Sequence, residues 1–228
     1  MSAPLRPSRR PAAGCIPTAC LGLIGLAAAA RAGEVTVTVL ASDGSPVEDV
    51  AVVLAPEAGG ARRGAPRKAR MDQIHRRFVP VVVVVDVGDS VEFPNSDSVS
   101  HQVYSFSPAK HFQLPLYKGA LHPPVRFDQA GLVVVGCNIH DEMVGYILVA
   151  DSPYHDETGT DGLARIGGVP AGRFRVTVWS PYIAAGDDAV LDTLVVAGTN
   201  PATLTVRLRK PLSRIPSPRP GLSGWDAY

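Results

Sequence analysis

The sequence has 228 residues, with 22 basic and 21 acidic side chains, 46% apolar residues and three cysteines. A chain of this length can form one large domain or two small domains with their own cores. The near-zero net charge excludes a disordered polyelectrolyte and argues against a nucleic-acid-binding protein, which would carry a large basic excess. No apolar stretch reaches the roughly 18 residues that a membrane-spanning helix needs, so we expect no integral membrane segment.

The first 32 residues have the pattern of a signal peptide. A basic region with three arginines is followed by an apolar stretch from about residue 19 to residue 30, and Ala30-Arg31-Ala32 then precedes Gly33. A signal peptidase accepts such a small-x-small sequence. The short apolar stretch disfavours a membrane anchor as the alternative. We therefore predict cleavage between Ala32 and Gly33 and a periplasmic or secreted location.

Removal of residues 1–32 leaves Cys137 as the remaining cysteine. It also takes away four arginines and no acidic residue, so the net charge becomes about −3. Cys137 then has no partner for an internal disulfide. An unpaired thiol in an oxidising compartment is a liability unless something occupies it. Cys137 is therefore the first candidate for a functional residue.

Valine-rich segments with period-two alternation predict an all-β protein, because successive side chains of a strand point to opposite faces. The segment 81–85 has five consecutive valines, which is typical of a strand buried on both faces. Short strands separated by glycine and proline favour a Greek-key sandwich. The expected strands are 35–39, 50–54, 79–87, 90–93, 103–106, 125–127, 132–135, 144–149, 163–166, 174–179, 190–196 and 204–208.

Three segments are expected to lack regular structure. Residues 56–70 are rich in Pro, Gly, Ala and Arg and are interpreted as a solvated basic loop. Residues 110–124 are expected to be irregular, with His111 and His122 as ordinary loop histidines. Residues 210–228 are rich in Pro, Ser, Arg and Gly, which predicts a disordered tail.

Four metal-binding side chains occur at turns. Cys137, His140 and Met143 lie within seven residues after the strand 132–135, and His101 follows an earlier turn. Two imidazoles, one thiolate and one weak thioether form the ligand set of a blue-copper electron-transfer site. Structural zinc would use more cysteines or histidines and no methionine, and the Cys-x2-His turn suits a catalytic dyad poorly. We therefore predict one copper ion bound by these four residues.

The four residues belong to a longer pattern in the central part of the chain: Phe78-x-Pro80, Val87-Gly88-Asp89-x-Val91-x-Phe93-x-Asn95, His101, Gly131 and Cys137-x2-His140-x2-Met143. With this pattern, residues 71–150 resemble the cupredoxins, the plastocyanin-, amicyanin- and pseudoazurin-like blue copper proteins. The resemblance implies a Greek-key β-sandwich and a periplasmic one-electron carrier that exchanges electrons with a redox partner protein. It also implies that His101, Cys137 and His140 are equatorial copper ligands and that Met143 is the axial ligand.

Turn motifs lie on both sides of this segment: Asp43-Gly44-x-Pro46, Thr160-Asp161-Gly162 and Val169-Pro-Ala-Gly172. With the strands around them, they resemble the two halves of a carboxypeptidase regulatory-like or transthyretin-like β-sandwich. The resemblance implies a discontinuous domain of residues 33–58 and 151–209, into which the cupredoxin domain is inserted. Alternatively, residues 33–55 supply the first strands of the cupredoxin itself. Proteins with this combination are often described as methylamine-utilisation-like.

The leading hypothesis is a periplasmic blue-copper electron carrier. The alternatives are a copper-handling protein without a redox role and a secreted β-sandwich that serves as a binding module or scaffold. We expect no enzymatic activity, because a site with four protein ligands leaves no open position for a substrate. The sequence also lacks the His-x-His pairs on which multicopper oxidases and copper nitrite reductases depend.

Overall fold

The computed structural model describes residues 33–59, 63–119, 122–183, 192–197 and 201–213. The predicted signal peptide, residues 1–32, and most of the predicted tail, from residue 214 onward, lie outside these ranges. Regular structure in the described residues consists of strands alone, which confirms the all-β prediction. No helix that could cross a membrane occurs in this part of the chain.

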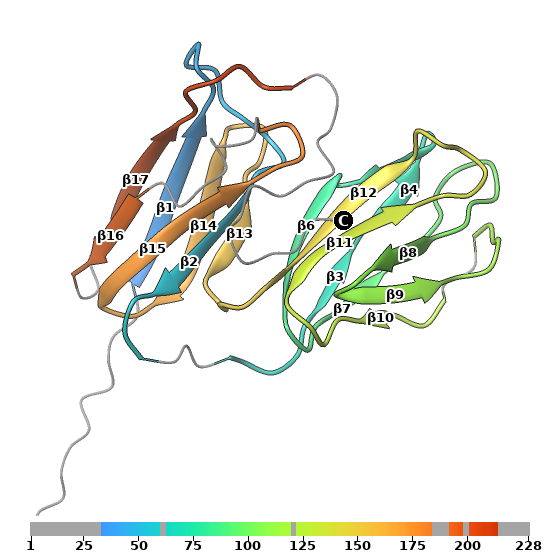
Figure 1. Ribbon diagram of the computed structural model, residues 1–228, viewed down its shortest axis with the longest axis horizontal. Helices are drawn as coiled ribbons and strands as arrows, with labels where there is room; N and C mark the ends of the chain where they lie inside the picture. Colours follow the sequence, from blue (N-terminus) through green and yellow to red (C-terminus); the bar gives the residue numbers. More distant parts are fainter. Residues whose placement is uncertain (1–32, 60–62, 120–121, 184–191, 198–200, 214–228) are drawn as a thin grey trace, which may run out of the picture.

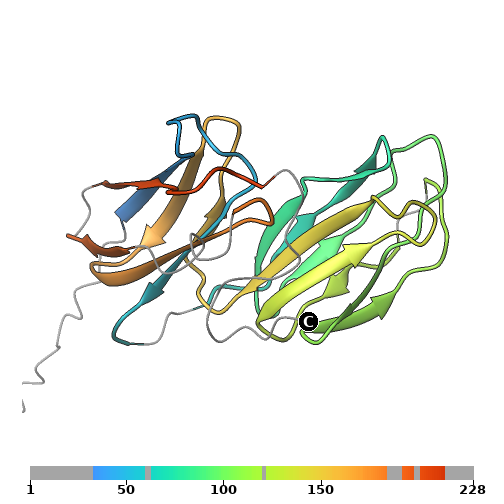
Figure 2. The ribbon, with the colours of Figure 1, turned by 45° about the horizontal axis from the view of Figure 1, so that its top comes forward.

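The strands form two units that lie side by side (Figure 1, Figure 2). We call the unit made of β1, β2 and β13–β17 the flanking sandwich, and the unit made of β3–β12 the central sandwich. The strands are β1 (Gly33–Leu40), β2 (Ala51–Pro56), β3 (Lys68–Arg70), β4 (Asp72–Ile74), β5 (Arg77–Val79), β6 (Val82–Asp86), β7 (Ser90–Glu92), β8 (Tyr104–Ser107), β9 (Lys110–Gln113), β10 (Val125–Arg126), β11 (Gly131–Gly136), β12 (Val144–Ala150), β13 (His155–Glu157), β14 (Leu163–Val169), β15 (Gly172–Trp179), β16 (Asp192–Val196) and β17 (Ala202–Arg207).

The flanking sandwich joins segments that are far apart in the sequence. Strand β1 pairs antiparallel with β14 and parallel with β17, while β2 lies between β13 and β15. Every second residue of β1 points inward, so Val35, Val37 and Val39 have no exposed surface. Residues 33–56 thus pair with strands that follow residue 150.

The central sandwich is built around a five-stranded sheet with the order β6-β12-β11-β8-β9. A smaller sheet, β10-β7-β3, and the β4–β5 hairpin complete the unit. Its core contains the aromatic side chains of Phe78 and Phe127 together with the inward-facing residues of β11 and β12, such as Val133 and Ile147. This packing stabilises the two strands from which the loop 137–143 extends.

Strand β6 belongs to two cores at once. Val83 and Val85 point into the core of the central sandwich, whereas Val82 and Val84 point into a second cluster that includes Trp179 of the flanking sandwich. Period-two alternation places these two pairs on opposite faces of the strand. The prediction of a valine strand buried on both faces is therefore confirmed for residues 82–85, and the flanking sandwich covers one of the faces.

Several of the predicted strands and loops were wrong. The strand predicted at 79–87 is divided into β5 and β6, because Pro80 has no N–H with which to continue a ladder. Residues 68–70, predicted to be loop, form β3 alongside β7. Residues 110–113, predicted to be irregular, form β9 and pair with β8. Strands β4 and β13 were missed as well. Strands β3, β9 and β13 lie at sheet edges, and they are too short and too polar to show an apolar alternation.

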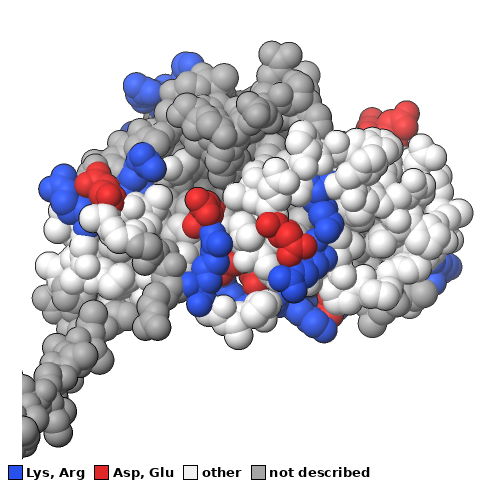
Figure 3. Space-filling view, turned by 60° about the horizontal axis from the view of Figure 1, so that its bottom comes forward, with Lys and Arg blue, Asp and Glu red and all other residues white. Residues whose placement is uncertain are grey.

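Acidic side chains compensate the basic segment that contains β3. In Figure 3, blue and red side chains lie next to one another on the face turned toward the viewer. Because the basic side chain of each pair is 37–67% exposed, water screens the pairs and each stabilises the fold only weakly. The pairs are Arg63–Asp151 (2.7 Å), Arg67–Asp86 (3.0 Å), Lys68–Glu92 (3.2 Å) and Arg70–Asp72 (2.7 Å).

Candidate metal centre

The loop between β11 and β12 carries three of the four predicted ligands. Cys137 directly follows β11 and Met143 directly precedes β12. The loop closes on itself, because the N–H of Cys137 donates to the carbonyl of Met143 (3.2 Å) and the N–H of Met143 donates to the carbonyl of His140 (2.9 Å). The two strands pair antiparallel from Gly131 to Gly136 and so hold both ends of the loop.

His101 reaches the same place from the segment between β7 and β8. Its backbone exchanges two hydrogen bonds with Tyr117, because the N–H of each residue donates to the carbonyl of the other at 3.0 and 2.9 Å. The side-chain amide of Asn95 donates to the carbonyls of Val99 (3.0 Å) and Tyr117 (2.8 Å). These bonds fix the segment, and the side chain of His101 is completely buried.

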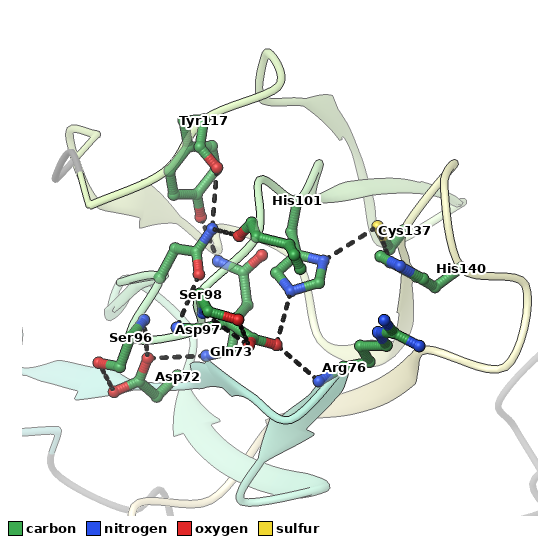
Figure 4. A network of polar contacts seen from close by, with 12 residues as sticks. Asp72, Gln73, Arg76, Ser96, Asp97, Ser98, His101, Tyr117, Cys137 and His140 are labelled. Atoms are coloured by element: carbon green, nitrogen blue, oxygen red, sulfur yellow. Dashed lines mark hydrogen bonds and ion pairs between the residues drawn. The ribbon is translucent and has the colours of Figure 1, made fainter.

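The structure brings the donor atoms of His101, Cys137 and His140 together. The Nδ1 atoms of His101 and His140 lie 3.8 and 4.0 Å from the Sγ atom of Cys137 (Figure 4). All three donor atoms lie within 4.8 Å of one another, and no other such group of three occurs in the described ranges. Metal bonds of about 2.0–2.3 Å at angles of about 110–120° would separate nitrogen and sulfur by about 3.6–3.8 Å. The three side chains therefore fit one small metal ion.

The chemistry of these donors restricts the metal. A thiolate favours Cu(I) and zinc, and imidazole suits copper and zinc, whereas magnesium and calcium prefer oxygen ligands. Cys137 is 3% exposed, so water has little access to the sulfur. Met143 is 1% exposed and belongs to the same core cluster as Cys137. Its role as an axial ligand stays a prediction.

The carboxylate of Asp97 contacts the imidazole of His101, one of the predicted ligands. The Oδ2 atom of Asp97 lies 2.9 Å from Nε2 of His101 and also accepts the backbone N–H of Arg76 (2.7 Å). These hydrogen bonds, that of His101 first, lower the pKa of Asp97 well below its usual value. The carboxylate is therefore ionised and accepts, and Nε2 of His101 carries the proton.

Tyr117, which is buried, connects His101 to the hairpin β4–β5. The hydroxyl of Tyr117 donates to the carbonyl of Phe93, and the side-chain amide of Gln73 donates to the tyrosine oxygen. Burial raises the pKa of Tyr117 to about 12, so the hydroxyl keeps its proton. Sequence reasoning missed Asp97, Arg76 and Tyr117 as neighbours of the site. The one available signal was a carboxylate four residues before a ligand histidine.

His111 and His122 are not part of this group of donor atoms. His111 is on β9, with its ring against Phe106 at a centroid distance of 5.1 Å. The ring of His122 packs against Tyr117 at 4.5 Å. Neither belongs to a group of three metal-binding side chains within the described residues. Both rings thus pack against aromatic side chains, and His111, expected in a loop, lies on a strand.

Comparison with protein-family models and with curated proteins gives no match. Among solved structures, the chain is similar to a purple cupredoxin from Nitrosopumilus maritimus, at 23% identity and a TM-score of 0.33, over 36% of this chain and 99% of the cupredoxin. It is similar to an oxidised mutant of amicyanin at 19% identity and a TM-score of 0.34, over 43% of this chain and 98% of amicyanin.

The similar structures include one enzyme. A copper-containing nitrite reductase from Thermus scotoductus SA-01 matches at 27% identity and a TM-score of 0.35, over 42% of this chain and 25% of the reductase. Each of these three structures matches less than half of this chain.

Proposed function

We propose that this chain is a type 1 copper protein that carries single electrons. The observation that supports this function is the group formed by His101, Cys137 and His140, whose donor atoms lie within 4.8 Å of one another at the end of a β-sandwich. Met143, buried at the start of the next strand, would be the weak fourth ligand. Two imidazoles, a thiolate and a thioether are the donors of such a centre.

Copper bound here would supply a one-electron change between Cu(I) and Cu(II). The chain's contribution is to hold its donors in one arrangement that suits both states. The β11–β12 ladder holds Cys137 and Met143, and the double hydrogen bond to Tyr117 holds His101. Since the first support is a strand ladder and the second a bridge between buried residues, little movement would accompany electron transfer. Such rigidity favours a carrier over a protein that must release its metal.

The solvent-facing side of the centre supports exchange with a partner protein. His140 is only half-buried, and Ile139 beside it is 51% exposed. An apolar residue next to the most accessible ligand gives a redox partner a short approach to the metal. Four protein donors would leave no open position for a substrate, so we propose a carrier and not an enzyme.

The proposed carrier is exported and has two modules. The pattern of residues 1–32 supports export to the periplasm, where Cys137 as the remaining cysteine would be protected by the metal. The strand pairing of residues 33–56 with β13–β17 supports a discontinuous, regulatory-like sandwich of residues 33–58 and 151–209. The cupredoxin-like module of residues 71–150 would be inserted into it.

The test is titration of the purified, metal-free protein with Cu(II), followed by voltammetry. We expect one copper per chain, intense visible absorption from a thiolate–copper bond, and a reversible one-electron wave. Colour with irreversible electrochemistry and rapid copper transfer to a chelator would instead identify a copper-handling protein. Failure to bind copper at one equivalent would overturn the proposal.

A further inference from the structure

The carboxylate of Asp97 contacts the nitrogen of His101 that faces away from the metal position. The Oδ2–Nε2 distance is 2.9 Å, while the opposite ring nitrogen, Nδ1, faces the Sγ atom of Cys137 at 3.8 Å. A neutral imidazole carries its proton on one nitrogen and its lone pair on the other. A hydrogen bond from Nε2 therefore leaves the lone pair of Nδ1 free to bind a metal.

The carboxylate is itself held from several directions, as Figure 4 shows. Its Oδ2 atom accepts the N–H of Arg76 (2.7 Å), and its Oδ1 atom accepts the N–H of Ser98 (2.7 Å). The N–H of Asp97 donates to Oδ1 of Asn95 (3.0 Å). The side chain of Asp97 is only 8% exposed. Its position is therefore fixed before any metal binds.

The hydrogen bond from Arg76 depends on an uncommon turn. The hairpin β4–β5 turns through His75 and Arg76, which both have positive φ values, 52° and 59°. A two-residue hairpin turn with two positive φ values is usually made by Asn-Gly, because other side chains are disfavoured there. This turn brings the N–H of Arg76 to the carboxylate of Asp97.

We propose that Asp97 is a positioning residue of the metal centre, which fixes the Nε2–H tautomer of His101 and sets the balance between the two copper states. This inference rests on the proposed copper-binding function. A negative charge next to a fully buried imidazole interacts strongly, since little water screens it. The carboxylate makes His101 a stronger donor and stabilises Cu(II), the more highly charged state, more than Cu(I).

The test compares Asp97→Asn with Asp72→Asn in the full chain. Asparagine keeps the shape and an acceptor oxygen but removes the charge. Asp72 is the matched control, because it is similarly buried (11% exposed side chain) and bonds Ser96, next to Asp97, without contacting a predicted ligand. We would measure Cu(II) and Cu(I) affinities by chelator competition, and the reduction potential by voltammetry.

We expect D97N to lose about 10–100-fold in Cu(II) affinity and clearly less in Cu(I) affinity. The reduction potential then rises, by about 59 mV for each tenfold change in the ratio of the two affinities. D72N should keep the wild-type potential. A D97N potential equal to that of the wild type, with copper bound in both, would overturn the role of Asp97 and leave the proposed function intact. A wild type that binds no copper would overturn the function instead.

A second measurement does not depend on the variant's folding. In the metal-free wild-type protein labelled with 15N at histidine, we expect the ring spectrum of His101 to show the proton on Nε2. A proton on Nδ1 would overturn the inference. This readout reports the tautomer directly, so it separates a positioning role from a general contribution to stability.

Discussion

The side chain of Glu157 in the flanking sandwich accepts a hydrogen bond from the backbone N–H of Val84 in the central sandwich. Strand β6, which contains Val84, is at the edge of its sheet, so this N–H would otherwise lack a partner strand. Without Glu157, the N–H of Val84 would be buried between the two sandwiches with no hydrogen-bond acceptor, which costs free energy. The contact between the two sandwiches therefore includes a titratable side chain, that of Glu157.

This group makes stability depend on pH. Burial, together with the negative charges of Asp156 and Asp49, raises the pKa of Glu157 to about 7, from 4.5 when unperturbed. The unfolded chain releases the proton first as pH rises, so the folded state is destabilised between about pH 4.5 and pH 7. His155, whose pKa is lowered by burial, acts in the opposite direction. Wild-type stability alone would therefore hide the effect of Glu157.

Comparison with Glu157→Gln isolates the contribution, because the amide keeps an acceptor for Val84 and cannot ionise. We expect the free energy of unfolding of E157Q, relative to wild type, to increase from pH 4.5 to pH 7, by on the order of 3 kcal/mol. Urea unfolding monitored by far-UV circular dichroism at several pH values measures this difference. A difference that is independent of pH would show that Glu157 titrates normally in the fold.

Replacement of Cys137 by serine should abolish the visible absorption expected of the copper-loaded protein without unfolding the chain. Cys137 is a free cysteine, so no disulfide is lost, and serine cannot supply the thiolate. The Cu(II) absorption spectrum should lose its thiolate–copper band, while the circular dichroism spectrum of the metal-free protein stays unchanged. Retention of the band in C137S would contradict the assignment of Cys137 as a ligand.

Met143→Gln tests the axial position. Glutamine supplies a harder oxygen donor, which favours Cu(II), so we expect copper to stay bound and the reduction potential to fall. Met143 is also almost fully buried, and a polar replacement in a core destabilises the fold. Met143→Leu is the control for this packing effect, because it removes the donor and keeps an apolar side chain. Equal potentials in wild type, M143Q and M143L would assign Met143 to the core alone.

Gly145 is predicted to tolerate no side chain. A Cβ atom added there would lie 2.9 Å from Cβ of Phe78 and 3.1 Å from Sδ of Met71. We expect Gly145→Ala to lose about 1–3 kcal/mol of stability from overpacking. Gly167→Ala is the matched control, because nothing lies within 4 Å of its added Cβ and its φ is not positive. Equal stability of the two variants, measured by urea unfolding, would show that β12 can shift.

The predicted strands succeeded where one face of a strand is apolar. The alternation of β1 and the five valines around β6 are local signals that burial alone explains. Strands β3 and β9 carry no such signal, because each places only one apolar side chain, Ala69 or Phe112, against the core. The sequence pattern of β6 also does not reveal that Trp179 covers its outer face, because Trp179 lies almost 100 residues later in the chain.

The candidate ligands could be predicted from the sequence because they, too, give a local signal. Cys137, His140 and Met143 form one short motif, and chemistry restricts what such a motif can bind. The residues around them are brought together only by the fold. Tyr117 and Arg76 reach the site through backbone bonds, which any residue type can make, so the sequence leaves no mark of them.

The apolar cluster between the two sandwiches limits which fragments of this protein can fold on their own. The ring of Tyr146 lies against that of Trp179, with centroids 5.6 Å apart, and Val82, Val84 and Leu148 share the same cluster. A chain trimmed to the central sandwich would keep all four candidate ligands and expose this apolar face to water. Such a fragment would tend to self-associate through it. A fragment that is meant to fold on its own as the central sandwich therefore needs β15, the strand of the flanking sandwich that carries Trp179.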